Sequence, residues 1–262
     1  MNNFSIQSKN TNYEYDISVF VPNCQQPEGG FPIIYVLDGR NYFEIAKQTV
    51  NLQSRNAAKT NVEHAIVVGI CHQEHDERMR RFLDFTAPAQ TYQFPERTKG
   101  KLDNIRDMGG AENFSRFIEE ELKPVIESRY SIDKKKQTLY GHSLSGYFVL
   151  WSYITKPSSF QTHLAVSPSI WWNDQELFHY LENADLGEQN SVFIIVGEQE
   201  GFMVKDAICF YDKLPTGAMK QLYIAQDENH ASVVPTTMSR AFRFSTERHK
   251  IKLVLRAAKY IV

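Results

Sequence analysis

Residues 139–149 read LYGHSLSGYFV, and the order of small and apolar residues in this stretch decides the fold. An apolar, strand-like run ends at Gly141, Ser143 follows, and a helix-like segment begins at Leu144. A sharp turn between a strand and a helix holds a serine hydroxyl clear of the sheet. The start of the helix also presents backbone N–H groups and a positive dipole end to a developing oxyanion. The stretch therefore predicts a nucleophile at Ser143.

One position departs from the usual pattern around such a serine, which is G-x-S-x-G. Ser145 stands where the second glycine is usual, and Gly146 follows one residue later. Serine is small enough to let the helix pack closely on the strand, so we expect the turn to tolerate it. The alternative is a strand–turn–helix with an incidental serine. We expect His142 to pack rather than to act as a base, because neighbours on a tight turn point in different directions.

Strand-like and helix-like segments alternate along the rest of the chain, and residues 13–21 alternate apolar and polar side chains as in an antiparallel edge strand. Short continuous apolar runs predict strands buried on both faces at residues 31–37 and 65–70. Further strands are predicted at residues 137–140, 163–166, 192–196 and 220–225. Helices are predicted at residues 41–58, 113–130 (with a bend at Pro124), 144–154, 178–181 and 236–244. This order predicts one α/β domain over residues 1–262. We expect a mostly parallel central sheet with N-terminal antiparallel strands and helices on both faces.

The composition indicates which kinds of partner the protein lacks and in which compartment it resides. A net charge of −2, from 29 basic and 31 acidic residues, argues against nucleic acid as a partner. The three cysteines are far apart and form no disulfide framework, which suits a reducing compartment. There is no signal-like N-terminus and no apolar run near the ~20 residues that a membrane span needs. We therefore expect a cytoplasmic protein without a membrane partner.

Residues 71–76 contain cysteine, histidine and aspartate but match no zinc spacing, so we expect no metal.

The partners of Ser143 should follow it in the order acid, then histidine. The predicted strand at 192–196 leads into Gly-Glu-Gln-Glu, and we favour Glu200 over Glu198 because the extra residues let its side chain turn toward the next strand. The alternative is a solvated acidic turn, since charged residues in loops are usually exposed. His230 follows the last predicted strand and precedes the last helix, where the base belongs.

Several stretches together resemble the putative-esterase family of α/β-hydrolases, and most closely its siderophore trilactone esterases of the enterobactin and bacillibactin type. The matching stretches are residues 35–39, 109–114, 139–146, 167–172 and 197–200. The resemblance implies catalytic roles for Ser143 and His230 and supports Glu200, although some members are thought to use a serine–histidine pair alone. It also implies an oxyanion hole formed by the backbone N–H groups of Leu144 and Arg40.

Basic and aromatic residues near the expected site predict how substrate is held. A basic cluster follows a strand at Arg78, Arg80 and Arg81. With the side chain of Arg40 it could attract an anionic substrate, or it could form a solvated loop. Trp171 and Trp172 follow another strand end, where at least one could stack on an aromatic ring or both could simply pack. Residues 87–108 lack periodicity and, with residues 167–185, are predicted to be flap segments over the site.

These expectations describe a serine esterase that acts through an acyl-enzyme and needs no cofactor. The resemblance implies the trilactone of a catecholate siderophore, in its ferric form, as substrate. The alternatives are a small-ester, acetyl or thioester hydrolase, similar to S-formylglutathione hydrolases or feruloyl esterases, and a non-catalytic hydrolase-like binding protein. The sequence leaves open the oligomeric state and the role of residues 246–262.

Overall fold

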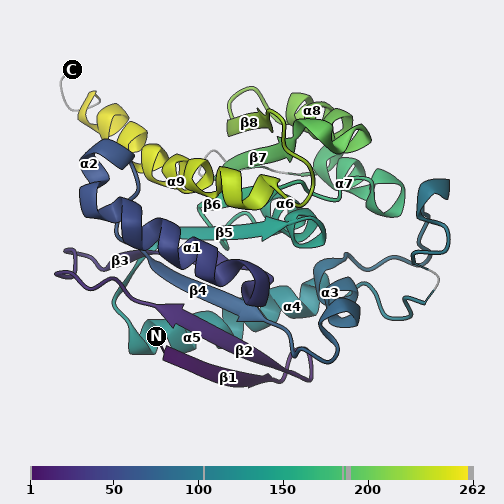
Figure 1. The fold of residues 1–262 in the computed structure, drawn as a ribbon, viewed down its shortest axis with the longest axis horizontal. Helices are drawn as coiled ribbons and strands as arrows, with labels where there is room; N and C mark the ends of the chain where they lie inside the picture. Colours follow the sequence, from purple (N-terminus) through teal and green to yellow (C-terminus); the bar gives the residue numbers. More distant parts are fainter. Residues whose placement is uncertain (1, 103, 185, 187–189, 259–262) are drawn as a thin grey trace.

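Apolar strands that are buried on both faces form the middle of a mixed sheet (Figure 1). The computed structural model describes residues 2–102, 104–184, 186 and 190–258, with the backbone alone for residues 247–258. Within these residues eight strands pair in the order β1-β2-β4-β3-β5-β6-β7-β8. Their bounds are Asn2–Ser8 (β1), Tyr13–Phe20 (β2), Phe31–Val36 (β3), Ile66–Cys71 (β4), Ile132–His142 (β5), Thr162–Val166 (β6), Ser191–Gly197 (β7) and Met219–Ala225 (β8).

The pairing of the strands confirms the predicted mostly parallel sheet with antiparallel strands at its N-terminal side. β1 pairs with β2 and β2 with β4 in antiparallel fashion, and the remaining neighbours are parallel. Residues 13–21 were expected to form an edge strand, and this is wrong. β2 lies inside the sheet because β1, whose residues are mostly polar and exposed, covers its outer side.

Helices cover both faces of the sheet, as predicted. On one face, α1 (Gly39–Gln53) and α9 (Val233–Ala258) bury apolar residues against the strands (Figure 1). On the other face lies the larger core, which holds most of the aromatic side chains. Its helices are α3 (Glu77–Phe85), α4 (Ala111–Arg116), α5 (Lys123–Arg129), α6 (Leu144–Thr155), α7 (Trp172–Glu182) and α8 (Phe202–Lys213). No helix in the described part of the chain is long and apolar enough to cross a membrane.

Two predicted helices differ in detail from the expectation. The segment expected at 113–130 is continuous but changes pitch, with a π-helical turn at Phe117–Leu122 between α4 and α5. Pro124 follows that turn at the start of α5, where a missing N–H is tolerated. In the segment expected at 41–58 the regular helix ends at Gln53, and a 3₁₀ turn leads to the short α2 (Ala57–Thr60).

The last four residues of the C-terminal tail, 259–262, lie outside the described residues.

The register of the parallel strands brings distant loops to one edge of the sheet. Val36 pairs with Tyr140, so the loop after β3 emerges beside the turn after β5. Gly197 pairs with Ala225, so the loops after β7 and β8 also emerge together. Ligand sites of open α/β sheets lie at this carboxyl edge. The fold therefore gathers four loops around one point.

Candidate active site

The turn at Ser143 is backbone-strained and tightly packed. Ser143 has φ 62° and ψ −117°, outside the regions that non-glycine residues normally adopt. A Cβ atom at Gly141 would lie 2.5 Å from the carbonyl oxygen of Ser145, and one at Gly146 would lie 2.9 Å from that of Val166. Only glycine fits at these two positions, so β5 and α6 can approach closely. Such conformations cost on the order of 1–3 kcal/mol and persist where the surrounding structure over-determines them, often at functional sites.

Three side chains from separate loops form a hydrogen-bonded chain at this turn. The Nε2 atom of His230 lies 3.0 Å from the Oγ atom of Ser143. Its Nδ1 atom lies 2.5 Å from Oε2 of Glu200. The arrangement leaves Nε2 to accept the serine proton while the carboxylate holds the Nδ1–H tautomer, which is the geometry of a serine–histidine–acid triad.

The carboxylate of Glu200 accepts hydrogen bonds from other groups besides His230. Its side chain is 2 % exposed, and Oε1 accepts hydrogen bonds from the Ser167 hydroxyl at 2.5 Å and from the backbone N–H of Gly197 at 2.7 Å. Burial alone would raise the pKa of this carboxyl, but the hydrogen bonds from His230, Ser167 and Gly197 outweigh it and lower the pKa. Glu198 instead accepts the backbone N–H of Asp227. Of the two acids weighed from the sequence, the structure brings Glu200 to the histidine.

His142 packs against His230 and supports the site. It is 6 % exposed, its Nδ1 atom lies 2.9 Å from the Tyr42 hydroxyl, and its ring centroid lies 4.5 Å from that of His230. Burial, and then the positive charge that His230 can carry, lower the pKa of His142 from 6.5 to about 4. His142 is therefore a neutral packing residue near pH 7, in line with the expectation.

The two backbone N–H groups expected to hold an oxyanion lie in the first turns of two helices. Leu144 begins α6 and Arg40 is the second residue of α1. The first N–H groups of a helix have no acceptor within it, so they can bind an anion. The neighbouring positions of β3 and β5 bring these two helix starts to the same edge of the sheet.

A cavity of about 380 Å³ lies over Ser143 and His230. Its remaining lining residues are Arg78, Arg81, Phe82, Arg97, Thr98, Lys101, Leu102, Leu144, Ser169, Trp171, Trp172, Phe202 and Met203. Both predicted flap segments contribute to this wall, although residues 103 and 185 lie outside the described residues. The mixture of apolar, aromatic and basic side chains suits an aromatic substrate that carries negative charge.

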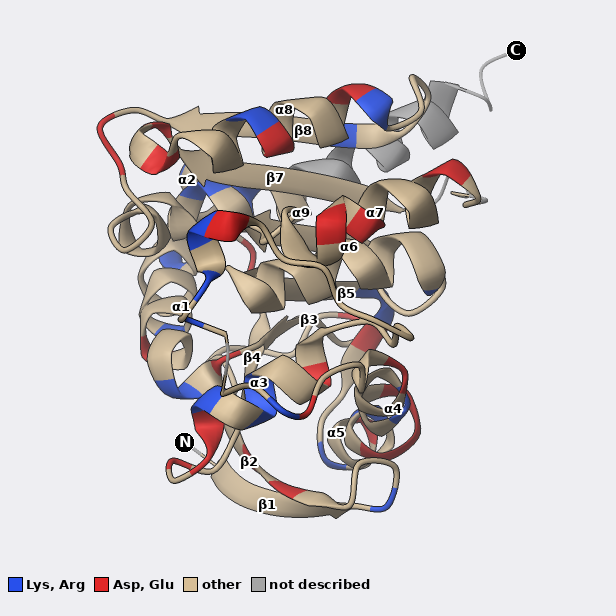
Figure 2. Ribbon diagram, turned by 90° about the vertical axis from the view of Figure 1, so that its right-hand side faces the viewer, with Lys and Arg blue, Asp and Glu red and all other residues tan. Residues whose placement is uncertain are grey.

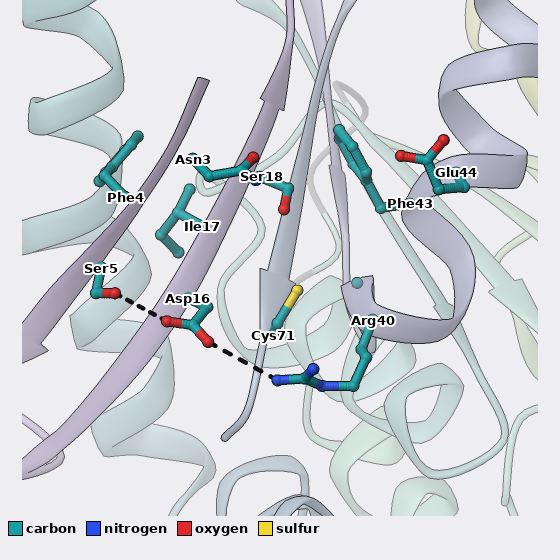
Figure 3. A pocket seen from close by; sticks show the side chains of 11 residues that line it. Asn3, Phe4, Ser5, Asp16, Ile17, Ser18, Arg40, Phe43, Glu44 and Cys71 are labelled. Atoms are coloured by element: carbon teal, nitrogen blue, oxygen red, sulfur yellow. Dashed lines mark hydrogen bonds and ion pairs between the residues drawn. The ribbon is translucent and has the colours of Figure 1, made fainter. Parts of the chain in front are cut away.

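The side chain of Arg40 does not reach this cavity, so its predicted contact with substrate is wrong. It lies in a different groove, of about 530 Å³, between α1 and the strands β1 and β2 (Figure 3). There its guanidinium lies 3.8 Å from both Asp16 and Glu74 and donates to the His72 carbonyl. Two carboxylates thus draw the side chain away from Ser143, while the backbone of Arg40 stays near the turn.

The arginines of α3, drawn in blue in Figure 2, have different surroundings. Arg78 is exposed, lines the cavity and donates to the carbonyl of Lys101. Arg81 also lines the cavity, but its guanidinium is bound by both oxygens of Asp38 at 2.6 and 3.0 Å. Its charge is largely neutralised, so the prediction that Arg81 reads substrate charge does not fit its contacts. Arg80 faces the buried Asp84 instead.

The sequence reasoning missed two cations at the cavity. Arg97 and Lys101 both come from the segment 87–108, which had been predicted as a flap without naming any residue that binds substrate. The guanidinium of Arg97 lies 3.6 Å from the ring centroid of Phe202 and 5.9 Å from that of Trp171. The signal available in the sequence was their place in an aperiodic segment of mixed charge that was predicted to be a flap.

The two tryptophans have separate roles. Trp171 is partly exposed and borders the cavity beside Arg97. Trp172 also lines the cavity but is fully buried, with its ring against Phe94 and Phe82 at centroid distances of 4.7 and 5.6 Å. It therefore packs beneath the flap, which was the alternative weighed for it. Only Trp171 of the pair offers a surface to a substrate ring.

His72, in the stretch 71–76 that matched no zinc spacing, is bonded to a buried acid. His72 bonds through Nε2 to Asp84 at 3.0 Å, and Asp84 also accepts from Tyr15 and Arg80. Within the described residues, no group of three or more histidine, cysteine, aspartate or glutamate side chains is placed to hold a metal ion.

The low pKa of His142 predicts a loss of stability in mild acid. Because the unfolded chain takes up the proton near pH 6.5 and the folded protein only near pH 4, stability is complete above 6.5 and falls as the pH drops toward 4. This group should account for a loss on the order of 3 kcal/mol over that range. Urea unfolding of the wild type and of His142→Gln at several pH values measures it, and the variant should show a shallower slope. His179→Gln, at an exposed histidine, is the matched control. Equal slopes in wild type and His142→Gln would contradict the prediction.

Comparison with known proteins places the chain in a family. A family model described as putative esterase matches residues 8–231. Ferri-bacillibactin esterase BesA of Bacillus subtilis is 38% identical over 254 residues, which cover 92% of this chain and 87% of that protein. The crystal structure of BES protein from Bacillus cereus has a TM-score of 0.84 and 38% identity, covering 93% of this chain and 95% of that one. Siderophore hydrolase EstA from Aspergillus nidulans has a TM-score of 0.78 and 25% identity, covering 94% of each chain. These matches confirm the expected α/β-hydrolase fold and ester-hydrolase class: the chain belongs to the putative esterase family.

Proposed function

We propose that this protein hydrolyses the trilactone ester bonds of a catecholate siderophore, with Ser143 as nucleophile, His230 as base and Glu200 as the acid that orients the base. The observation that carries the proposal is the continuous chain of hydrogen bonds from Glu200 through His230 to Ser143 at the base of the cavity. Without this chain a serine hydroxyl is a weak nucleophile near neutral pH.

The reaction proceeds by two acyl transfers. His230 takes the proton of Ser143 as Oγ attacks the ester carbonyl, and the N–H groups of Leu144 and Arg40 stabilise the oxyanion. Collapse of the intermediate breaks the ester C–O bond, and His230 returns the proton to the leaving alkoxide. Water then attacks the acyl-enzyme with the same proton transfers, which releases the acid and restores Ser143. Glu200 stays ionised throughout, which its lowered pKa supports.

The substrate assignment rests on the cavity wall and on the relatives. Trp171 and Phe202 present aromatic surface, while Arg78, Arg97 and Lys101 add positive charge around it. An iron-bound tris-catecholate is both aromatic and strongly anionic, so this wall suits it. The similarity to ferri-bacillibactin esterase supports the same class of substrate.

The flap segments and the compartment are part of the proposal. Residues 87–108 and 167–185 act as flaps, tied to each other where the N–H and carbonyl of Gln93 bond to Asn173 Oδ1 and the N–H of Asp174. The reaction takes place in the cytoplasm, which the three free cysteines Cys24, Cys71 and Cys209 support.

Replacing the nucleophile should abolish hydrolysis. Ser143→Ala is expected to lower kcat on the order of 10⁶-fold, because the attacking oxygen is absent. The measurement is a screen of trilactone siderophores, with and without iron, beside simple aryl esters and thioesters. A fluorophosphonate probe should label the wild type and leave this variant unlabelled. Near-normal turnover by Ser143→Ala would sink the enzymatic assignment, and turnover of aryl esters or thioesters alone would favour a small-ester hydrolase.

Two neighbouring glutamates provide a matched pair for testing the acid. Glu200→Gln should lower kcat on the order of 10²- to 10⁴-fold with KM little changed, since the amide no longer fixes the imidazole tautomer. Glu198→Gln should have a far smaller effect, because the Glu198 side chain accepts the backbone N–H of Asp227 and not a bond from His230. Similar kinetics for the two variants would argue for a serine–histidine pair without an acid.

Positive charge on the flap should make turnover of an anionic substrate depend on salt. The value of kcat/KM for a ferric catecholate should fall as ionic strength rises, since exposed charges are screened beyond ~10 Å at 0.1 M salt. Arg97→Gln and Lys101→Gln should reduce both kcat/KM and its salt dependence, and a neutral aryl ester should change little. Lys99→Gln removes a charge from the same loop outside the cavity and is the control. Equal losses for charged and neutral esters would identify the two cations as structural.

A further inference from the structure

The carboxylate of Asp38 is buried next to the turn and is used in an unusual way. Asp38 is the N-cap residue of α1, has φ 52° and is 2 % exposed. An N-cap aspartate normally accepts a hydrogen bond from an N–H in the first turn of its own helix. Asp38 makes no such side-chain cap. Its carboxylate is directed instead toward two other elements of the site.

Three hydrogen bonds connect Asp38 to those elements. Arg81 of α3 donates from Nε to Oδ1 at 2.6 Å and from a terminal nitrogen to Oδ2 at 3.0 Å. Ser145, which is fully buried in the first turn of α6, donates from Oγ to Oδ2 at 2.7 Å. The same Ser145 hydroxyl accepts the backbone N–H of His142 at 2.9 Å. One carboxylate thus joins the starts of α1 and α6 to α3.

We propose that Ser145, Asp38 and Arg81 form a clamp that sets the distance between the two helix starts that stabilise the oxyanion. The inference rests on the proposed function, in which Leu144 and Arg40 supply the two N–H groups. These groups lie one residue before Ser145 and two residues after Asp38. The hydrogen bond between Ser145 and Asp38 therefore joins the two segments that carry these N–H groups. The three residues are positioning residues, because they act through the backbone.

Charge explains why the clamp needs Arg81. An unpaired carboxylate beside an oxyanion hole would oppose the negative charge that develops on the substrate. The two-point contact with the planar guanidinium neutralises Asp38 and also fixes its orientation. Removing Arg81 alone would leave a buried charge uncompensated, which is worse than removing both partners. This gives Arg81 a part in catalysis that is independent of the charge of the substrate.

The clamp gives a reason for Ser145 at the position where G-x-S-x-G has its second glycine. A glycine at position 145 would satisfy the close packing of α6 on β5 but would provide no hydroxyl. Ser145 is small enough for the same packing and adds the bond to Asp38. The chain thus replaces a residue that only permits the turn with one that also connects it to the neighbouring loop.

The test compares Ser145→Gly, Ser145→Ala and Arg81→Gln with wild type, using a neutral aryl ester and an anionic catecholate ester. Each variant should lose about 10- to 100-fold in kcat for both esters, with KM little changed, because small displacements of the oxyanion donors act on the transition state. Affinity for a boronic acid, whose tetrahedral adduct with Ser143 carries an oxygen in the same place, should fall in parallel. Lys99→Gln, on the exposed surface of the loop, should match wild type.

Paired substitutions separate the clamp from a general loss of structure. The double variant Asp38→Asn/Arg81→Gln should retain more activity than Arg81→Gln, and Arg81→Lys should recover part of it. A lower melting temperature with kcat and boronate affinity unchanged would overturn the clamp, as would a loss confined to the anionic ester. An inactive Ser143→Ala beside fully active Ser145→Gly and Arg81→Gln would refute the clamp alone. An active Ser143→Ala would refute the proposed function beneath it.

Discussion

The strained backbone of Ser143 is the constraint on which the rest of the site depends. Its positive φ holds the hydroxyl above the sheet, and hydrogen bonds on both sides keep it there: its N–H donates to the Val166 carbonyl at 3.0 Å, and its own carbonyl accepts from Ser169. Both partners come from β6 and the loop that follows it. The Ser143 carbonyl also accepts the N–H of Tyr147 in α6 at 3.0 Å, so the strain is supported both by the neighbouring strand and by the helix that follows the turn. Such support is how an unfavourable conformation persists in a folded protein.

The same neighbouring strand leads to the acid. Ser167, the residue after β6, also has a positive φ, and its hydroxyl donates to Glu200 at 2.5 Å. Its backbone N–H donates to the Ile195 carbonyl at 2.6 Å, which fastens the loop to β7. Ser143, Ser167 and Glu200 thus follow three adjacent parallel strands. The first two are each placed by a bond to the next strand, and Glu200 is placed by bonds from Ser167 and Gly197. Parallel register turns residues far apart in the chain into neighbours along one edge.

The sequence was sufficient to place side chains whose positions follow chain order, and insufficient where a side chain's direction depends on a distant partner. The positions of Ser143, Glu200 and His230 relative to the predicted strand ends were sufficient to bring the three together. The side-chain direction of Arg40 depends on Asp16 and Glu74, which no local pattern connects to it. Likewise β1 was missed because it contributes few apolar side chains and owes its place to pairing with β2. Long-range contacts of this kind are set by tertiary structure and leave no periodic signal.

The arginines around the cavity differ in whether a buried carboxylate neutralises their charge. Arg80 and Arg81 neighbour each other in α3, and each meets a carboxylate that is about 1 % exposed, Asp84 and Asp38 respectively. A buried carboxylate needs a fixed cation, so the charge of each arginine is used inside the protein and is not available to a substrate. Arg78, on the exposed side of the same helix, and Arg97, which lies on the ring of Phe202, keep their charge available at the cavity. In the proposed clamp the ion pair of Arg81 with Asp38 holds the oxyanion donors in place. The charges of Arg78 and Arg97 at the rim of the cavity are the ones that a substrate can reach from solution.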